Sequence, residues 1–423
     1  MQASSTYRRL LLPIYLPTFL YSMAQGVLVP VLPIYAKHYG GSYAIAGVVV
    51  AASWIGTTIC DVPAGLILPK LGFRLQMILG AVLFGGAAII LGLVHTIPVM
   101  ISIQLVAGVG TAMWGVARHS YLTQATTVGD RGRAISLFGG INRGGQFIGP
   151  TVGGFVAQYF GLGTAIVVAG AVACSTIIAV GLFVRESEGI TIRSSHRLDL
   201  GVLKQSVAGN GQAVLAAGTV QVFGQMVRAG RQVVVPLFAK YAIGLDTAAI
   251  GQIVSASSLV DMLMFPVAGF LMDRWGRKAA VVPSFAILSL AMILIPLCGS
   301  YWALMGAMVL AGFGNGMGAG TMMTLGADLS PPGRTGEFLG IWRLIGDSGQ
   351  AMAPLIAGAV ADAIGIGLTT GATAGLGIIA AVTMAFFMRE TRWDHLPVDQ
   401  RPVSRAPFSG GWSRRLGGAR RKS

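Results

Sequence analysis

The stretch that decides the fold is AGVGTAM at residues 107–113, because it returns as AGFGNGM at residues 311–317, 204 positions later. The same offset relates other small residues from residue 44 to residue 163. The matched pairs include Gly47 and Gly251, Ala64 and Ala268, Gly72 and Gly276, Gly145 and Gly349, Pro150 and Pro354, and Gly161 and Gly365. Chance matches between glycine-rich segments do not keep one register over such a length, so the chain contains two copies of one structural unit.

The composition places both copies in a membrane. Of the 423 residues, 54% are apolar and only 11% are charged, and the mean hydropathy is +0.72. Soluble proteins carry about 25% charged residues, so this chain cannot cover a soluble surface, which excludes a soluble enzyme. Twelve apolar runs are long enough to span a bilayer, which takes about 20 residues. These runs lie at residues 10–36, 44–68, 75–94, 97–125, 134–160, 162–184, 210–241, 248–272, 279–298, 301–327, 336–362 and 366–388.

The sequence therefore predicts an all-α membrane protein of twelve transmembrane helices in two pseudo-symmetric six-helix halves. We expect the first half at residues 1–184, a polar cytoplasmic linker at 185–209 and the second half at 210–388. Residues 389–423 form a basic tail, rich in Pro, Gly and Ser, that we expect to be disordered. This tail either lies near anionic lipid headgroups or is simply solvated.

The basic residues indicate the orientation in the membrane. Lys and Arg number 30 against 15 Asp and Glu, a formal net charge of +15. With the N-terminus in the cytoplasm, most of them fall on cytoplasmic turns and tails, and only Lys37 and Lys240 fall on the opposite face. Cytoplasmic loops of membrane proteins are enriched in Lys and Arg. We therefore expect a multi-pass protein of the cytoplasmic membrane with both termini inside, and no nucleic-acid partner.

Two equivalent turns carry a charged glycine motif. The turn at residues 269–278 reads GFLMDRWGRK, and its first-half counterpart at residues 65–74 reads GLILPKLGFR, with Pro69 in place of the acid. The shared glycines permit close helix packing, and Asp273 can accept hydrogen bonds from a neighbouring helix N-terminus. The candidate gating residues here are Gly65, Gly72, Arg74, Gly269, Asp273, Arg274, Gly276 and Arg277.

These motifs carry a family resemblance. The turn at residues 269–278 resembles the loop motif G-x-x-x-D-R-x-G-R-K/R of the major facilitator superfamily. Residues 144–154, GGQFIGPTVGG, resemble the G-x-x-x-G-P-x-x-G-G motif of its drug:proton antiporter branch, with Gly149 and Pro150 at the expected bend. Gln104 stands where this family often carries an Arg implicated in proton handling.

The resemblance implies a secondary active transporter that works by alternating access, in the form of proton-coupled efflux of a small organic solute. An alternative is transport of an anionic metabolite or lipid-like anion, and an alternative from another class is a non-transporting receptor or channel. The sequence contains no ATP-binding P-loop, catalytic triad or metal-ligand cluster. We therefore expect no enzymatic activity, cofactor or metal. The expected partners are the solute, protons and the bilayer, and we expect a monomer.

Polar side chains within the apolar runs mark the candidate substrate site, because charges inside a membrane are costly and functional candidates by default. By family analogy the cavity is lined from runs 10–36, 97–125, 210–241 and 301–327. The candidates are Gln25, Arg118, Gln225, Arg228, Arg231 and Asn315. Arg118, Arg228 and Arg231 together predict a positive cavity that accepts a carboxylate, a phosphate or a zwitterion. Many antiporters of the family carry cationic drugs instead, and this conflict stays open.

Three acids lie inside apolar runs, and each is either a proton carrier or part of an ion pair that joins helices. These are Asp61, Asp261 and Asp347. Counted by helical rise from the cytoplasmic turns, Asp61 lies about as deep as Arg343, and Arg143 about as deep as Asp261. We therefore expect these two pairs to bridge the halves. Arg343 can instead pair with Asp347, one turn away on its own helix.

Overall fold

The computed structural model describes residues 10–126, 131–184, 200–331 and 334–391. The part of the chain that it describes is helical, with short turns and no strand. In the first half the helices are η1 (Leu11–Tyr15), α2 (Leu16–Gly40), α3 (Tyr43–Leu91), α4 (Ile97–Gln124), α5 (Arg131–Phe160) and α6 (Leu162–Phe183). In the second half they are α7 (Leu200–Phe238), η2 (Ala239–Ile243), α8 (Thr247–Trp275), α9 (Arg277–Leu294), η3 (Ile295–Leu297), α10 (Tyr301–Met317), α11 (Thr321–Asp328), α12 (Thr335–Ile364), α13 (Ile366–Val382) and η4 (Thr383–Phe387).

The backbone repeats at the same offset as the sequence. α3 and α8 begin at Tyr43 and Thr247, α4 and α10 at Ile97 and Tyr301, and α6 and α13 at Leu162 and Ile366. α3 bends sharply at Gly72, where φ is 76°, and its counterpart Gly276 ends α8 with a φ of 96°. Residues with a side chain rarely adopt this left-handed region, so each half requires glycine at this turn.

Two boundaries differ from the sequence prediction. α7 begins at Leu200, so residues 200–209 belong to a helix rather than to the expected linker, of which residues 185–199 lie outside the described residues. The expected continuous run at 301–327 is divided, because α10 ends at Met317 and Gly320 has a φ of 77° before α11 begins. The expected tail is described only as far as Thr391.

The surface of the molecule is suited to lipid. Large apolar side chains are exposed on the helices, where a soluble protein would carry polar ones. Examples are Leu93, Ile178, Leu182, Trp302, Leu368 and Phe386, each more than half exposed. Eight of the described helices are long and apolar enough to cross a bilayer. The chain is therefore an all-helical membrane protein, and the count of twelve spans stays a prediction.

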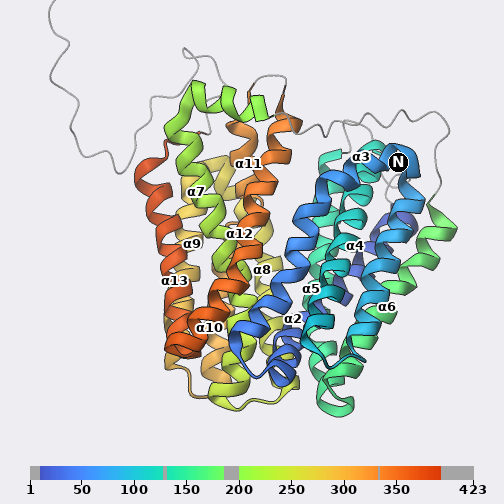
Figure 1. The fold of residues 1–423 in the computed structure, drawn as a ribbon. Helices are drawn as coiled ribbons and strands as arrows, with labels where there is room; N and C mark the ends of the chain where they lie inside the picture. Colours follow the sequence, from blue (N-terminus) through green and yellow to red (C-terminus); the bar gives the residue numbers. More distant parts are fainter. Residues whose placement is uncertain (1–9, 127–130, 185–199, 332–333, 392–423) are drawn as a thin grey trace, which may run out of the picture.

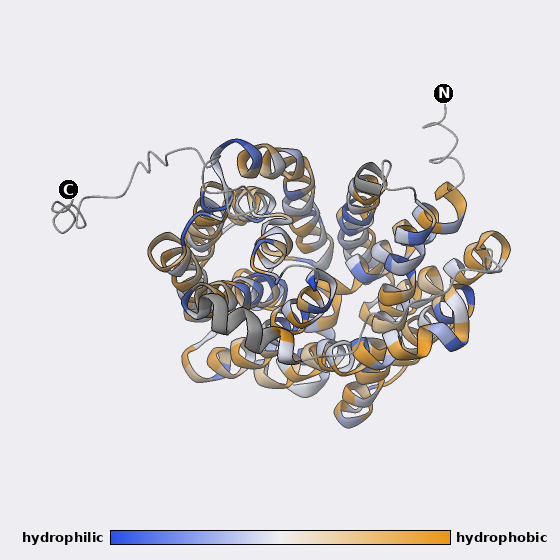
Figure 2. Cartoon of the chain, turned by 90° about the horizontal axis from the view of Figure 1, so that it is seen from above, coloured by the Kyte–Doolittle hydropathy of each residue, from blue (hydrophilic) through white to orange (hydrophobic). Residues whose placement is uncertain are grey.

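The helices form two groups that lie side by side (Figures 1 and 2). One group contains α2–α6 and the other contains α7–α13, and they meet where α3 packs against α12 and α5 against α8. In Figure 1 the groups touch at the lower end and part toward the end where the N-terminus lies. The molecule is thus closed at one end.

Matched glycine contacts build this closed end. A Cβ atom on Gly47 of α3 would overlap the carbonyl oxygen of Pro354 on α12. At the equivalent positions, a Cβ atom on Gly251 of α8 would overlap the carbonyl oxygen of Pro150 on α5. Because glycine allows the two backbones to touch, each crossing excludes any larger residue. We define the closed end as residues 43–47 with 354–362 and residues 150–158 with 247–251.

Polar caps complete both crossings, again at the offset of 204. Asp362 of α12 accepts hydrogen bonds from the backbone nitrogens of Tyr43 and Ala44, both at 2.9 Å. At the second crossing, Gln158 of α5 accepts from the nitrogen of Thr247 at 3.2 Å and from its hydroxyl at 3.1 Å. Each half therefore satisfies free N–H groups at the start of a helix in the other half.

Asp362→Ala should shift the molecule toward a state in which the closed end parts. Loss of a helix cap costs about 1 kcal/mol, which corresponds to an approximately fivefold change in the equilibrium. Spin labels at His38 and Ala242, both exposed near this end, would report the change as a larger population of long distances. Ser300→Ala is the matched control, because Ser300 caps Ala303 within one half. An equal shift in both variants would contradict a role in joining the halves.

Candidate functional site

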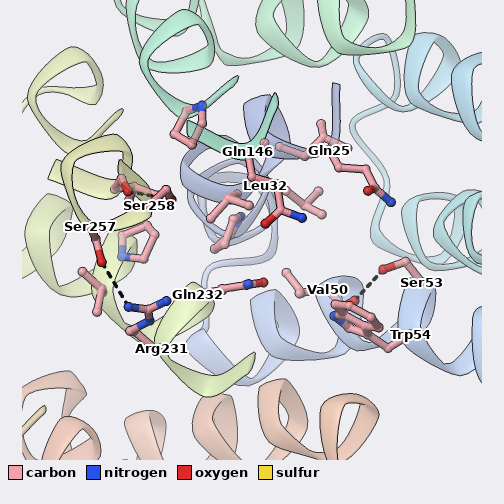
Figure 3. Close-up of a pocket in the computed structure, with 18 of the residues that line it drawn as sticks. Gln25, Leu32, Val50, Ser53, Trp54, Gln146, Arg231, Gln232, Ser257 and Ser258 are labelled. Atoms are coloured by element: carbon pink, nitrogen blue, oxygen red, sulfur yellow. Dashed lines mark hydrogen bonds between the residues drawn. The ribbon is translucent and has the colours of Figure 1, made fainter. Parts of the chain in front are cut away.

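A cavity of about 240 Å³ lies between the two groups of helices. It is lined from α2, α3, α4 and α5 on one side and from α7, α8 and α10 on the other (Figure 3). Its polar lining residues are Gln25, Ser53, Thr57, Gln104, Thr111, Gln146, Arg231, Gln232, Ser257, Ser258, Asp261 and Asn315. Several amides and hydroxyls therefore face a concave, otherwise apolar space, which is the usual character of a small-molecule site.

Arg231 is the cation of this cavity. Its Nη1 atom donates a hydrogen bond to the Ser257 hydroxyl at 3.1 Å, and Figure 3 shows this pair across the cavity from Ser53 and Trp54. Within the described part of the chain, Arg231 has no carboxylate at ion-pair distance. An arginine has five N–H donors in a planar fork, so Arg231 has donors to spare for an anionic group.

Asp261 lies in the cavity wall, where its charge is already matched. Arg143 of α5 forms an ion pair with Asp261 Oδ2, and Asn315 Nδ2 of α10 donates to Oδ1 at 2.9 Å. The Arg143 guanidinium also lies 4.9 Å from the ring centroid of Phe265 on α8. This pair joins the two groups of helices, as the matched depths led us to expect.

The second expected pairing contains a further acid. Arg343 Nη2 of α12 lies 3.3 Å from Asp61 Oδ2 of α3, across the interface between the groups. Arg343 Nε lies 3.4 Å from Asp347 Oδ2 on its own helix, so one guanidinium contacts two carboxylates. Gln350 Nε2 donates to Asp347 Oδ1 at 3.0 Å. We call Asp61, Arg343 and Asp347 the Asp–Arg–Asp triad.

Three of the six substrate-site candidates line the cavity, and three do not. Gln25, Arg231 and Asn315 are lining residues, whereas Arg118, Gln225 and Arg228 lie outside the lining. The expectation of three arginines in the cavity is therefore wrong for this conformation.

The two arginines that lie outside the cavity lining, Arg118 and Arg228, contact other groups of the protein. Arg118 lies 4.6 Å from the ring centroid of Phe138. Arg228 donates to the carbonyl of Gly318 at 3.3 Å and lies 5.2 Å from the ring centroid of Phe285. The break between α10 and α11 explains the position of Arg228, because carbonyls at a helix end need donors from elsewhere. A sequence pattern that treats 301–327 as one helix cannot show this break.

The glutamines of α7 also lie in different surroundings. Gln232 lines the cavity, but Gln221, eleven positions earlier, is buried, with its Nε2 atom 3.5 Å from the Trp342 carbonyl on α12. α7 packs against both α12 and α13, so its side chains meet different neighbours along its length. Gln225 is half-buried between these regions.

At the turn after α8, the acid that caps the next helix is Glu390 rather than Asp273. Glu390 accepts from the backbone nitrogens of Arg277 at 2.7 Å and Lys278 at 3.0 Å, and Gly276 lies directly against its carboxylate. Arg277 Nε forms an ion pair with Asp328 Oδ2 at 2.8 Å. The capping role expected of Asp273 therefore falls to an acid placed in the tail by the sequence analysis.

The other motif residues have packing roles. Arg74 donates to the carbonyl of Gly181, which ties α3 to α6 in the half that lacks the acid. Gly149 faces the backbone of α2 at Met23, and Pro150 lines the cavity. Gly65 is buried, whereas Gly269 has open space where a Cβ atom would lie. Arg274 lies in the last turn of α8.

Sequence reasoning did not identify Asp362, Asp328 or Glu390. Asp362 had a usable signal, because it stands 204 positions after Gln158 at the end of an equivalent run. Asp328 and Glu390 each come just after an apolar run, and that position alone does not indicate a function.

Solved transporter structures share this fold. A bacterial homologue of the human lysosomal transporter Spinster, in an inward-facing and unoccupied conformation, matches with a TM-score of 0.73 and 14% identity over 90% of this chain and 96% of that chain. A mutant of the nucleoside transporter NupG matches with a TM-score of 0.75 and 14% identity, over 90% of this chain and 100% of that chain. At such identities the similarity shows the fold alone.

Relatives by sequence are also transporters or resistance proteins. An uncharacterised MFS-type transporter of Methanocaldococcus jannaschii is 19% identical over 357 residues, 84% of this chain and 91% of the relative. Multidrug resistance protein 2 of Bacillus subtilis is 26% identical over 62% of this chain and 66% of the relative. Quinolone resistance protein NorA of Staphylococcus aureus is 25% identical over 34% of this chain and 37% of its own length.

The family model of the Major Facilitator Superfamily matches residues 14–229 and 217–420, which together cover nearly the whole chain. The family and the structural matches are transporters rather than enzymes. The chain therefore belongs to the Major Facilitator Superfamily and is a multi-pass membrane transporter.

Proposed function

We propose that this transporter exports a small organic solute from the cytoplasm in exchange for protons. The observation that carries the proposal is a polar cavity between two groups of helices that are joined by matched glycine crossings at one end and by ion pairs farther along the interface. A central site that opens to one side at a time is the arrangement that alternating access requires. The antiporter-type segment at residues 144–154 and the names of the multidrug and quinolone resistance relatives support efflux.

The proposal includes an orientation. Basic residues gather at the turns near residues 65–74 and 269–278, which supports a cytoplasmic location for those turns and for both termini. The closed end then faces outside, and this conformation is inward-facing. We propose that residues 1–184 and 210–388 move as the two halves of a monomer.

The acids supply candidates for proton coupling. Asp61, Asp261 and Asp347 lie within the helices, and each contacts a cation that belongs to, or reaches across to, the other half. Proton binding at such a site changes the charge that holds the halves together, which links protonation to the conformational change.

A second candidate function is transport of an anionic or zwitterionic solute. Arg231 favours it, because this guanidinium faces the cavity with a single hydroxyl partner while the nearby Asp261 is paired with Arg143. Arginine keeps its charge in surroundings where lysine would lose it. The anionic group of a solute would complete the hydrogen bonding of Arg231.

A substrate screen in proteoliposomes tests the function directly. We expect at least one small organic solute to move against its gradient when a pH gradient is imposed, and to move only down its gradient without one. Substrate movement that ignores the pH gradient would contradict proton coupling. A solute-independent ion conductance with no solute flux would favour a channel.

Cysteines introduced beside Lys37 and beside Lys240 should react with a membrane-impermeant reagent added outside intact cells. The reason is that both lysines lie near the closed end, which we assign to the outer face. A cysteine near Lys278 is the control and should react only after the membrane is permeabilised. Reaction in the reverse pattern would contradict the orientation.

Arg231→Ala should weaken binding of an anionic substrate by about 10- to 100-fold, since a hydrogen bond to a charged group is worth roughly 1.5–3 kcal/mol. A neutral analogue of the same substrate should lose far less affinity. Gln232→Ala, which alters a neutral neighbour in the same cavity, should affect both compounds alike. Equal losses for the anion and its neutral analogue in Arg231→Ala would exclude an anion-binding role for Arg231.

A further inference from the structure

The two ion pairs between the halves differ in their charge balance. At Asp261 one carboxylate meets one guanidinium, that of Arg143, and Asn315 supplies a further donor. In the Asp–Arg–Asp triad two carboxylates meet a single guanidinium, at 3.3 Å and 3.4 Å. With both acids ionised, the triad carries one uncompensated negative charge.

Burial makes this imbalance costly. Asp347 is 8% exposed, and the side chain of Asp61 retains only 14% of its accessible surface. Asp61 Oδ1 is buried without a hydrogen-bond partner among the described residues, and Asp347 Oδ2 is buried with Arg343 Nε beside it at 3.4 Å. Both carboxyl groups depend on one guanidinium, whose Nη2 atom lies 3.3 Å from Asp61 and whose Nε atom lies 3.4 Å from Asp347. Two buried carboxylates that share one cation do not both ionise cheaply, and a proton would give one of them a further donor.

The surrounding charges do not remove the imbalance. Arg118 and His119 of α4 form no ion pair with an acid of the triad within the described residues. Cys60 adjoins Asp61 in the chain. On the side of α12 that meets α7, the neighbour of the triad is neutral, because Gln221 lies against Gly346. The next helix, α13 (Ile366–Val382), contains no titratable side chain.

We propose that Asp61 and Asp347 form one proton-binding site, in which a single proton is shared between the two carboxyl groups while Arg343 balances the remaining charge. The bound proton changes the net charge of the triad from minus one to zero. Because Asp61 belongs to α3 and Asp347 to α12, the proton is held between the two halves of the transporter. This inference rests on the proposed proton coupling and assigns the proton to this triad rather than to Asp261.

Infrared difference spectroscopy of the full chain in lipid nanodiscs, without substrate, tests the site. Lowering the pH should produce the carbonyl band of a protonated carboxyl group, identified with isotope-labelled aspartate. The band should be absent from both Asp61→Asn and Asp347→Asn, because either change leaves one carboxylate for one guanidinium. Asp261→Asn is the matched control and should keep the band. Asp347→Glu preserves both carboxyl groups and should also keep it, which separates loss of the site from misfolding.

Persistence of the band in both single variants, or its loss in Asp261→Asn, would overturn the assignment. Transport measurements separate this inference from the proposed function. In Asp347→Asn we expect downhill exchange of substrate to continue while uphill transport driven by a pH gradient is lost. If the wild-type protein shows the band but its substrate flux ignores the pH gradient, the proton site stands and the proposed coupling fails.

Discussion

The structure depends on the close approach of backbones at two glycine crossings. Gly47 against Pro354 and Gly251 against Pro150 bring the halves into direct contact at one end. Helices in lipid gain little from burying apolar surface against each other, so tight packing and hydrogen bonds must hold them together. Asp362 and Gln158 supply those hydrogen bonds at the same two crossings. Such a contact is tightly packed when the halves are closed, and few interdigitated side chains must separate when the halves move apart.

The twofold repeat provides a symmetric scaffold that carries different charges. Position 143 on α5 holds an arginine, and the equivalent position 347 on α12, at the offset of 204, holds an aspartate. Each faces the interface with the other half, so the interface of α5 with α8 contains a balanced pair and the interface of α3 with α12 contains the triad. Symmetry in the backbone allows the halves to rock about one site, whereas asymmetry in charge allows a proton to act on one side of that site.

The cavity takes its character from residues that the protein leaves unpaired. Arg228 donates a hydrogen bond to the carbonyl of Gly318 at the break after α10, and Arg143 forms an ion pair with Asp261. Among the described residues, the hydrogen-bond partner of Arg231, three positions after Arg228, is the Ser257 hydroxyl alone. Two arginines on one helix therefore differ in role because a neighbouring helix is interrupted beside one of them.

The sequence alone determined the helical class, the positions of the apolar runs and the repeat, because hydrophobic length and glycine register are properties of the chain itself. It also indicated the partners of Arg143 and Arg343, since depth along a helix follows from a constant rise per residue. Only the tertiary structure decided that Arg118 and Arg228 turn away from the cavity, that Glu390 caps α9 in place of Asp273, and that Asp347 joins Asp61 on one guanidinium. These outcomes depend on how each helix is rotated and where it breaks, and a single residue of rotation moves a side chain by about 100° around the helix axis.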